Sequence, residues 1–136
     1  MLGEFFAARS DDIDDAVVDG GPMNRFETVE AKTISSVSIA TLGEVLGIGT
    51  YEDVFDVVDQ GRLADHGEAG VDVVPDSLRD ALASEHDSAR VAELWHDTDE
   101  MRDWSAEEVL EVINELAALA RRASAADLRL WFWWSL

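Results

Sequence analysis

The last nine residues, LRLWFWWSL, place the strongest constraint on the fold, because three tryptophans and a phenylalanine lie within the final six positions. Aromatic residues favour strands. Extending the preceding helix from Ser105 through this segment would give a helix of more than about 30 residues, which is unusual in a globular domain. The segment is also far shorter than the ~20 residues that a helix needs to span a bilayer. The composition therefore predicts a strand.

In a strand, alternate side chains point to opposite faces. One face would be wholly apolar and the other would have an apolar centre, which is typical of a strand covered on both sides. The first face would carry Leu128, Leu130, Phe132, Trp134 and Leu136, and the second Arg129, Trp131, Trp133 and Ser135. We expect a core strand, paired with Leu2 to Ala8, in which Trp134 matters more for stability than Trp131 or Trp133.

A second interpretation is that Trp131 and Trp133 form a surface patch for a protein partner, because tryptophan is enriched at the energetic centres of interfaces. A membrane anchor ranks third, since the segment has no basic flank for anionic lipid. Neither the start of the chain nor any apolar run resembles a signal peptide or a membrane span. The sequence therefore predicts a soluble, cytoplasmic protein without membrane contact.

Apolar residues recur at helical spacing in several segments between the two predicted strands. The clearest is SAEEVLEVINELAALARR, in which Ser105 and Glu108 have the capping-box spacing. Thr50 and Gly47 mark the start of one helix and the end of another. Helices are expected from Ser10 or Asp11 to Asp19, over residues 35–46, from Thr50 to Gly61, after a cap at Asp76 or Ser77, from Ser88 to Trp95 and after Ser105.

The resulting fold class is α+β and predominantly helical, in one domain spanning residues 1–136. Five or six helices would pack on a small sheet that contains the N-terminal and C-terminal strands. The alternative is an all-α fold. Segment 62–70 is expected to be a loop, and segment 23–32 has no clear assignment.

Charge is the most unusual feature of the composition. Thirty acidic residues face ten basic ones, for a net charge of −20. Such a surface repels phosphate backbones, so direct nucleic-acid binding is not expected. It suits a protein partner with a basic surface, although a general adaptation of the surface to salt explains the same composition. The absence of cysteine excludes disulfides, thiol nucleophiles and cysteine-ligated metals.

Candidates for catalysis are few. His66 lies between carboxylates in DHGE, and His96 is followed by Asp97 and Asp99 in WHDTDE. Imidazole and carboxylate groups bind metals or transfer protons, so these four residues are weak candidates for a metal site. No pair of histidines has metalloprotease spacing, and the glycines near residue 47 do not match a nucleotide-binding loop. No cofactor is predicted.

These observations favour a non-enzymatic acidic binding or regulatory domain that acts through protein–protein interaction. An inhibitor or immunity-type protein for a basic partner is the specific form of this hypothesis. The alternative is a small metal-dependent enzyme that uses His, Asp and Glu side chains.

Overall fold

Strand β5 (Arg129–Ser135) lies at the centre of the sheet, as the composition of the tail predicts. In the computed structural model, which describes residues 2–22 and 24–136, the strand order is β2-β1-β5-β4-β3 and all four pairings are antiparallel. The other strands are β1 (Leu2–Ala8), β2 (Thr28–Glu30), β3 (Arg62–Leu63) and β4 (Ala69–Val74). The predicted pairing of the two terminal strands is confirmed over seven residue pairs.

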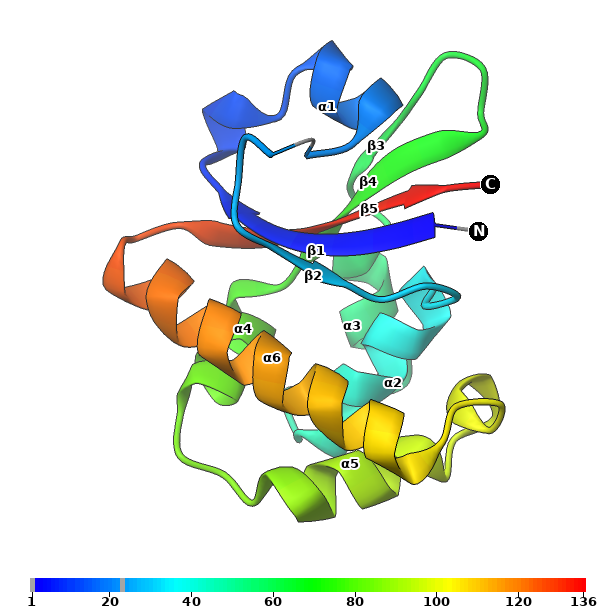
Figure 1. Ribbon diagram of the computed structural model, residues 1–136, viewed down its shortest axis with the longest axis vertical. Coiled ribbons are helices and arrows are strands. Elements are labelled where there is room, and N and C mark those ends of the chain that lie inside the picture. Colours follow the sequence, from blue (N-terminus) through cyan, green and yellow to red (C-terminus); the bar gives the residue numbers. More distant parts are fainter. Residues whose placement is uncertain (1, 23) are drawn as a thin grey trace.

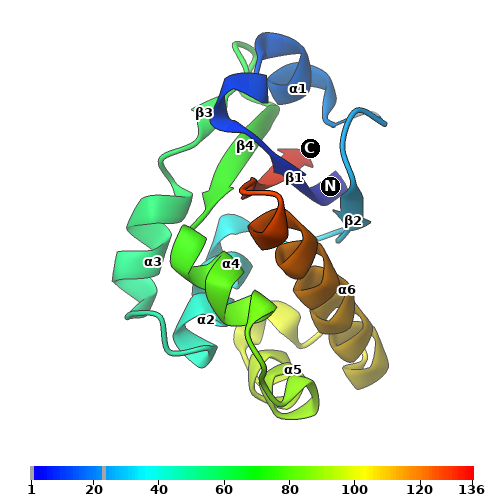
Figure 2. The ribbon, with the colours of Figure 1, turned by 90° about the vertical axis from the view of Figure 1, so that its left-hand side faces the viewer.

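Six α-helices within the described ranges cover the two faces of this sheet unequally (Figures 1 and 2). One face carries α1 (Asp15–Gly20) and the short 3-10 turn η1 (Ser10–Asp12), with Val57 of α3 packed at its border. The other faces the remaining helices, α2 (Ser36–Val45), α3 (Tyr51–Val58), α4 (Asp76–Ala83), α5 (Ser88–His96) and α6 (Ala106–Ala125), with a second 3-10 turn, η2 (Asp99–Met101). The fold is α+β, as predicted.

Each face of the sheet has its own hydrophobic core. Phe132 and Leu130 of β5 belong to the larger core beneath the sheet, together with the buried faces of α2 to α6. Trp131 and Trp133 belong to the smaller core, where they pack with Val17 and Val18 of α1. The prediction of a strand covered on both sides is therefore confirmed.

The burial of the tryptophans is the reverse of the order on which the predicted ranking depends. Trp131 and Trp133 are each only 7% exposed, whereas Trp134 is only partly buried. Helix α1 covers the centre of the face that carries Trp131 and Trp133. Trp134 instead lies near the end of the strand, where its indole packs over the neighbouring Gly70. Strand alternation gives the face on which a side chain lies, but not how well that face is covered.

Local capping signals set most helix ends as predicted. Ser105 and Glu108 form both hydrogen bonds of the capping box, and the Thr50 hydroxyl accepts from the backbone of Asp53. Gly47, just after α2, has a φ of 76°, a conformation that favours glycine.

Three boundaries differ from the prediction. Helix α1 is capped by Asp14 rather than by Ser10 or Asp11, because the Asp14 carboxylate accepts from Val17 N–H at 2.9 Å. Pro75 occupies the N-cap position of α4, so neither Asp76 nor Ser77 does so. Residues 62 and 63, expected in a loop, form β3 against β4. In the part of the chain that the structure describes, no helix has the length and apolar character needed to cross a bilayer.

Candidate functional site

An acidic groove runs between edge strand β2 and helix α6. Residues Glu108, Glu111 and Glu115 follow one another at three- and four-residue spacing, so they form a stripe on one side of the helix. The groove measures about 400 Å³ and is lined by Thr28, Val29, Glu30, Trp104, Glu108, Glu111, Val112 and Glu115. Four of these eight lining residues are glutamates and none is basic.

Strand β2 forms one edge of the sheet, and its outer side has no partner among the described residues. The N–H of Ala31 donates to the Gly3 carbonyl at 2.9 Å. Backbone groups alternate in direction along an antiparallel ladder, so those of Thr28 and Glu30 point away from β1. Edge groups of this kind are a template for an added strand.

Although Glu30 borders the groove, its side chain lies on the opposite face of the sheet from α6, where it forms a carboxylate pair with Glu4. Glu4 of β1 lies directly across from Glu30 of β2. Like charges in this position repel each other. Partial burial raises the pKa of Glu4, and the charge of Glu30 raises it further. The edge strand therefore has carboxylates on both of its faces.

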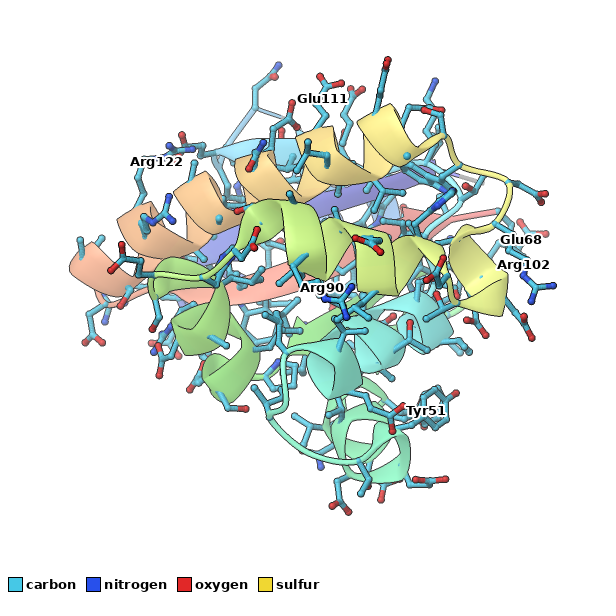
Figure 3. All side chains as sticks on the ribbon, turned by 90° about the horizontal axis from the view of Figure 1, so that it is seen from below. Tyr51, Glu68, Arg90, Arg102, Glu111 and Arg122 are labelled. Carbon is cyan, nitrogen blue, oxygen red and sulfur yellow. The ribbon has the colours of Figure 1, made fainter. Side chains whose placement is uncertain are left out.

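Most of the charge in the groove is not balanced internally. Among the described residues, Glu30, Glu111 and Glu115 form no ion pair. The Glu108 carboxylate accepts a hydrogen bond from the backbone N–H of Ser105, the N-cap of α6. Figure 3 shows Glu111 projecting outward from α6, with Arg122 nearer the C-terminal end of the same helix. Arg122 itself is held by Glu27, at 2.7 Å.

The predicted candidate His66 lies elsewhere, in the turn between β3 and β4. Its Nδ1 accepts from the N–H of Glu68 at 3.0 Å, and its Nε2 lies 2.6 Å from Asp19 of α1. These contacts define the neutral tautomer with the proton on Nε2. The pair borders an open pocket of about 470 Å³ that also contains Arg62 and Leu63. Both ring nitrogens are engaged, Nδ1 as an acceptor and Nε2 as a donor, so neither is free to bind a metal in this arrangement.

The second candidate group is far from the first, on the other side of the sheet. His96, at the end of α5, donates from Nε2 to the Trp104 carbonyl at 2.7 Å and so fastens α5 to the loop before α6. Asp97 is the exposed C-cap of α5, and Asp99 pairs with Arg102 at 2.9 Å. The structure does not bring His66 and His96 together. In the described ranges, no group of three or more His, Asp or Glu residues is arranged to hold a metal ion.

The proposed partner-binding residues Trp131 and Trp133 are core side chains. Their indole N–H groups donate to the carbonyls of Ala8 and Val18, each at 3.1 Å. Because each residue is only 7% exposed, they leave little surface for a protein partner.

Sequence reasoning missed the groove for a topological reason. The glutamates of α6 are recognisable as favourable charges near a helix N-terminus. Segment 28–30 gives no clear pattern on its own, because three residues are too few to define an alternation. Only the fold shows that the two segments, about 80 residues apart in sequence, lie side by side.

Comparison with known proteins adds no assignment to this site: no family model, no curated protein and no solved structure matches the chain.

Proposed function

We propose that this protein is a non-enzymatic binding domain that takes up a basic, extended segment of a protein partner in the groove between β2 and α6. The single observation that carries the proposal is the outer edge of β2, which lies open beside glutamates that have no basic partner among the described residues. Main-chain hydrogen bonds would supply affinity, and the charges would supply selectivity.

The geometry also defines the pattern of the segment. In an added strand, alternate side chains would face the α6 glutamates, and those between them would face the side of Glu4 and Glu30. Basic residues are therefore favoured on both faces of the partner strand. The proposal includes an inhibitor or immunity-type role toward a basic partner.

Two further parts of the proposal follow from composition. A surface with a net charge of −20 repels nucleic acid, so the partner is a protein rather than DNA or RNA. The cysteine-free chain needs no oxidising compartment, which is compatible with a cytoplasmic location.

Binding of a fluorescent decapeptide built from the repeat Lys-Lys-Val-Val, which places lysines on both faces of a strand, tests the electrostatic part of the proposal. It is measured by anisotropy at about 0.15 M salt. The triple variant Glu108→Gln, Glu111→Gln, Glu115→Gln should bind at least about tenfold more weakly, which corresponds to ~1.4 kcal/mol. Glutamine is also accepted in a capping box, so the start of α6 is preserved.

In the matched control, three exposed glutamates elsewhere are replaced by glutamine: Glu52, Glu85 and Glu100. These residues form no ion pair in the described chain. Both triple variants have the same net charge. Equal loss of affinity in the two would show that only overall charge attracts the peptide, and would overturn the groove as the site.

Strand addition is tested with two N-methylated versions of the same peptide. Only one edge of an added strand can form hydrogen bonds with β2. The N–H groups of alternate peptide residues point to the same edge, so N-methylation of one alternating set removes the donors of one edge. Methylation of one alternating set should abolish binding, and methylation of the other set should leave it unchanged. Equal effects of the two modifications would exclude strand addition.

The alternative function, a small metal-dependent enzyme, has no comparable support, because His66 and His96 lie in separate regions and both use Nε2 in hydrogen bonds. Metal analysis of the purified protein tests it. Stoichiometric metal that is lost on replacing either histidine would favour the enzyme.

A further inference from the structure

A second pocket, independent of the acidic groove, opens on the face of the sheet that carries α1. It lies between η1, the C-terminal end of α3 and strands β4 and β5, and it measures about 330 Å³. Its lining consists of Ser10, Ile13, Val57, Gln60, Gly61, Arg62, Val71, Val73, Arg129 and Trp131.

The charged residues that line this pocket are basic, and each is paired with a carboxylate just outside the lining, Arg62 with Asp15 and Arg129 with Asp76. Acidic residues outnumber basic ones by thirty to ten in the chain, yet the described residues that line this pocket include two arginines and no carboxylate. A random sample of this surface would be dominated by Asp and Glu. The pocket therefore offers an anion two guanidinium groups, which the acidic groove does not.

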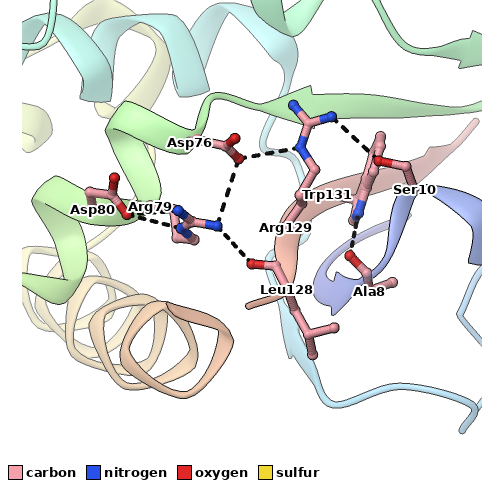
Figure 4. Close-up of polar contacts among 8 residues, drawn as sticks. All are labelled: Ala8, Ser10, Asp76, Arg79, Asp80, Leu128, Arg129 and Trp131. Carbon is pink, nitrogen blue, oxygen red and sulfur yellow. Dashed lines mark hydrogen bonds and ion pairs between the residues drawn. The ribbon is translucent and has the colours of Figure 1, made fainter. Parts of the chain in front are cut away.

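Both arginines are fixed in place and retain free donors. Arg129 donates to Asp76 at 3.2 Å, and its guanidinium lies 5.3 Å from the ring centre of Trp131 (Figure 4). Arg62 donates to the Ile13 carbonyl at 2.6 Å and pairs with Asp15. A guanidinium has five N–H groups, so each arginine has donors left for a ligand. Because these contacts hold the arginine side chains in place before a ligand binds, the entropic cost of binding is lower.

The floor of the pocket is apolar. Val71, Val73 and Trp131 of strands β4 and β5 lie at its base with only 1%, 8% and 7% of each residue exposed, and Ile13 and the partly exposed Val57 extend this apolar surface. Ligand pockets commonly combine such a floor with a few convergent polar groups. An inorganic anion would leave this floor uncovered, whereas an organic acid would cover it and present its charge to the arginines.

We propose that this pocket binds a small organic carboxylate with an apolar body, held by Arg62 and Arg129 over the valine and tryptophan floor. The net charge of −20 opposes any anion at long range. At about 0.15 M salt the repulsion from distant carboxylates is screened beyond ~8 Å. The charges that act on the ligand are then the two arginines and their partners Asp15 and Asp76.

Benzoate serves as the probe, with benzamide as its neutral analogue and inorganic phosphate as an anion without an apolar body. Each is titrated into the ¹⁵N-labelled full chain at about 0.15 M sodium chloride, at concentrations reaching tens of millimolar. Benzoate should give saturable shifts at the backbone amides of Val71 and Val73 and at the indole of Trp131. Benzamide and phosphate should bind at least about tenfold more weakly, as expected for loss of a charge-assisted hydrogen bond or of the apolar contact.

The variant Arg129→Gln should weaken benzoate binding at least about tenfold, whereas Arg90→Gln on exposed α5 should leave it unchanged after the same change of charge. The comparison of the three ligands on the unaltered protein remains decisive if Arg129→Gln does not fold. The proposal is overturned if benzoate gives no saturable shifts, if its shifts lie away from the pocket, or if benzamide or phosphate binds equally well.

Discussion

The indole of Trp133 donates a hydrogen bond to the carbonyl oxygen of Val18 at 3.1 Å and so ties the central strand of the sheet to the last turn of α1. The smaller core therefore depends on a polar contact as well as on apolar packing. In the same core, Trp131 makes an equivalent bond to Ala8 of the neighbouring strand.

This relationship predicts the effects of truncating the C-terminal tryptophans. Trp133→Ala and Trp131→Ala should each lower the free energy of unfolding by ~3–5 kcal/mol, the usual range for a buried aromatic residue. Each change also leaves a buried carbonyl without its donor. Trp134→Ala should have a smaller effect, because that side chain is only partly buried.

Urea denaturation of the three variants, followed by far-UV circular dichroism, measures this order. A larger loss for Trp134→Ala than for the other two would mean that the α1 layer contributes little to stability.

The sequence was sufficient for the parts of the fold that local patterns determine. The alternation in the tail predicts a two-sided strand, and the Ser105–Glu108 spacing predicts the start of the longest helix. Each of these signals involves residues that are only a few positions apart in the sequence. Their physical basis, side-chain direction and the capping of free N–H groups, does not depend on the rest of the chain.

Nonlocal contacts explain what the sequence did not predict. Strand β3 consists of two residues that become a strand only by pairing with Val71 and Gly70. The contact between His66 and Asp19 joins positions 47 residues apart, so the DHGE motif alone gives no partner for the imidazole. The acidic groove likewise exists only because β2 packs beside α6.

The capping box of α6 gives a second prediction. Ser105→Ala should lower the free energy of unfolding by ~1 kcal/mol, because the N–H of Glu108 loses its acceptor. Ser77→Ala is the control, since Ser77 is an exposed serine near the start of α4 but is not its N-cap. Its effect should stay within ~0.5 kcal/mol, the usual range for a surface change. Equal losses in the two variants, measured by urea denaturation, would contradict a specific role for the cap.

The net charge gives a third prediction, for salt. Repulsion among thirty carboxylates opposes the compact state, and added salt shortens its range from ~30 Å at about 0.01 M to ~8 Å at about 0.15 M. The melting temperature should therefore rise between these concentrations. Sodium chloride and tetramethylammonium chloride should act alike, because screening depends on ionic strength alone. A flat or falling melting temperature would count against repulsion, and a rise with sodium only would indicate specific ion binding.

The fourth prediction concerns Asp72, a half-buried carboxyl in the middle of β4. Burial raises its pKa to about 6 and the charge of Asp59 contributes in the same direction, while a hydrogen bond from the Trp134 side chain opposes the shift. The ordinary value is 3.8. Because the folded state binds the proton more tightly, the stability that Asp72 contributes is fully present below about pH 4 and is lost as the pH rises through about 6.

The variant Asp72→Asn should therefore be more stable than the natural chain at pH values above the pKa of Asp72, and nearly equal to it in acid. A shift of about two pKa units corresponds to ~3 kcal/mol as an upper bound on the difference. Thermal melts of both proteins across this pH range measure it. Asp56→Asn, on exposed α3, controls for the removal of one negative charge. A difference between Asp72→Asn and the natural chain that does not change with pH would show that the carboxyl of Asp72 ionises in the fold as readily as in the unfolded chain.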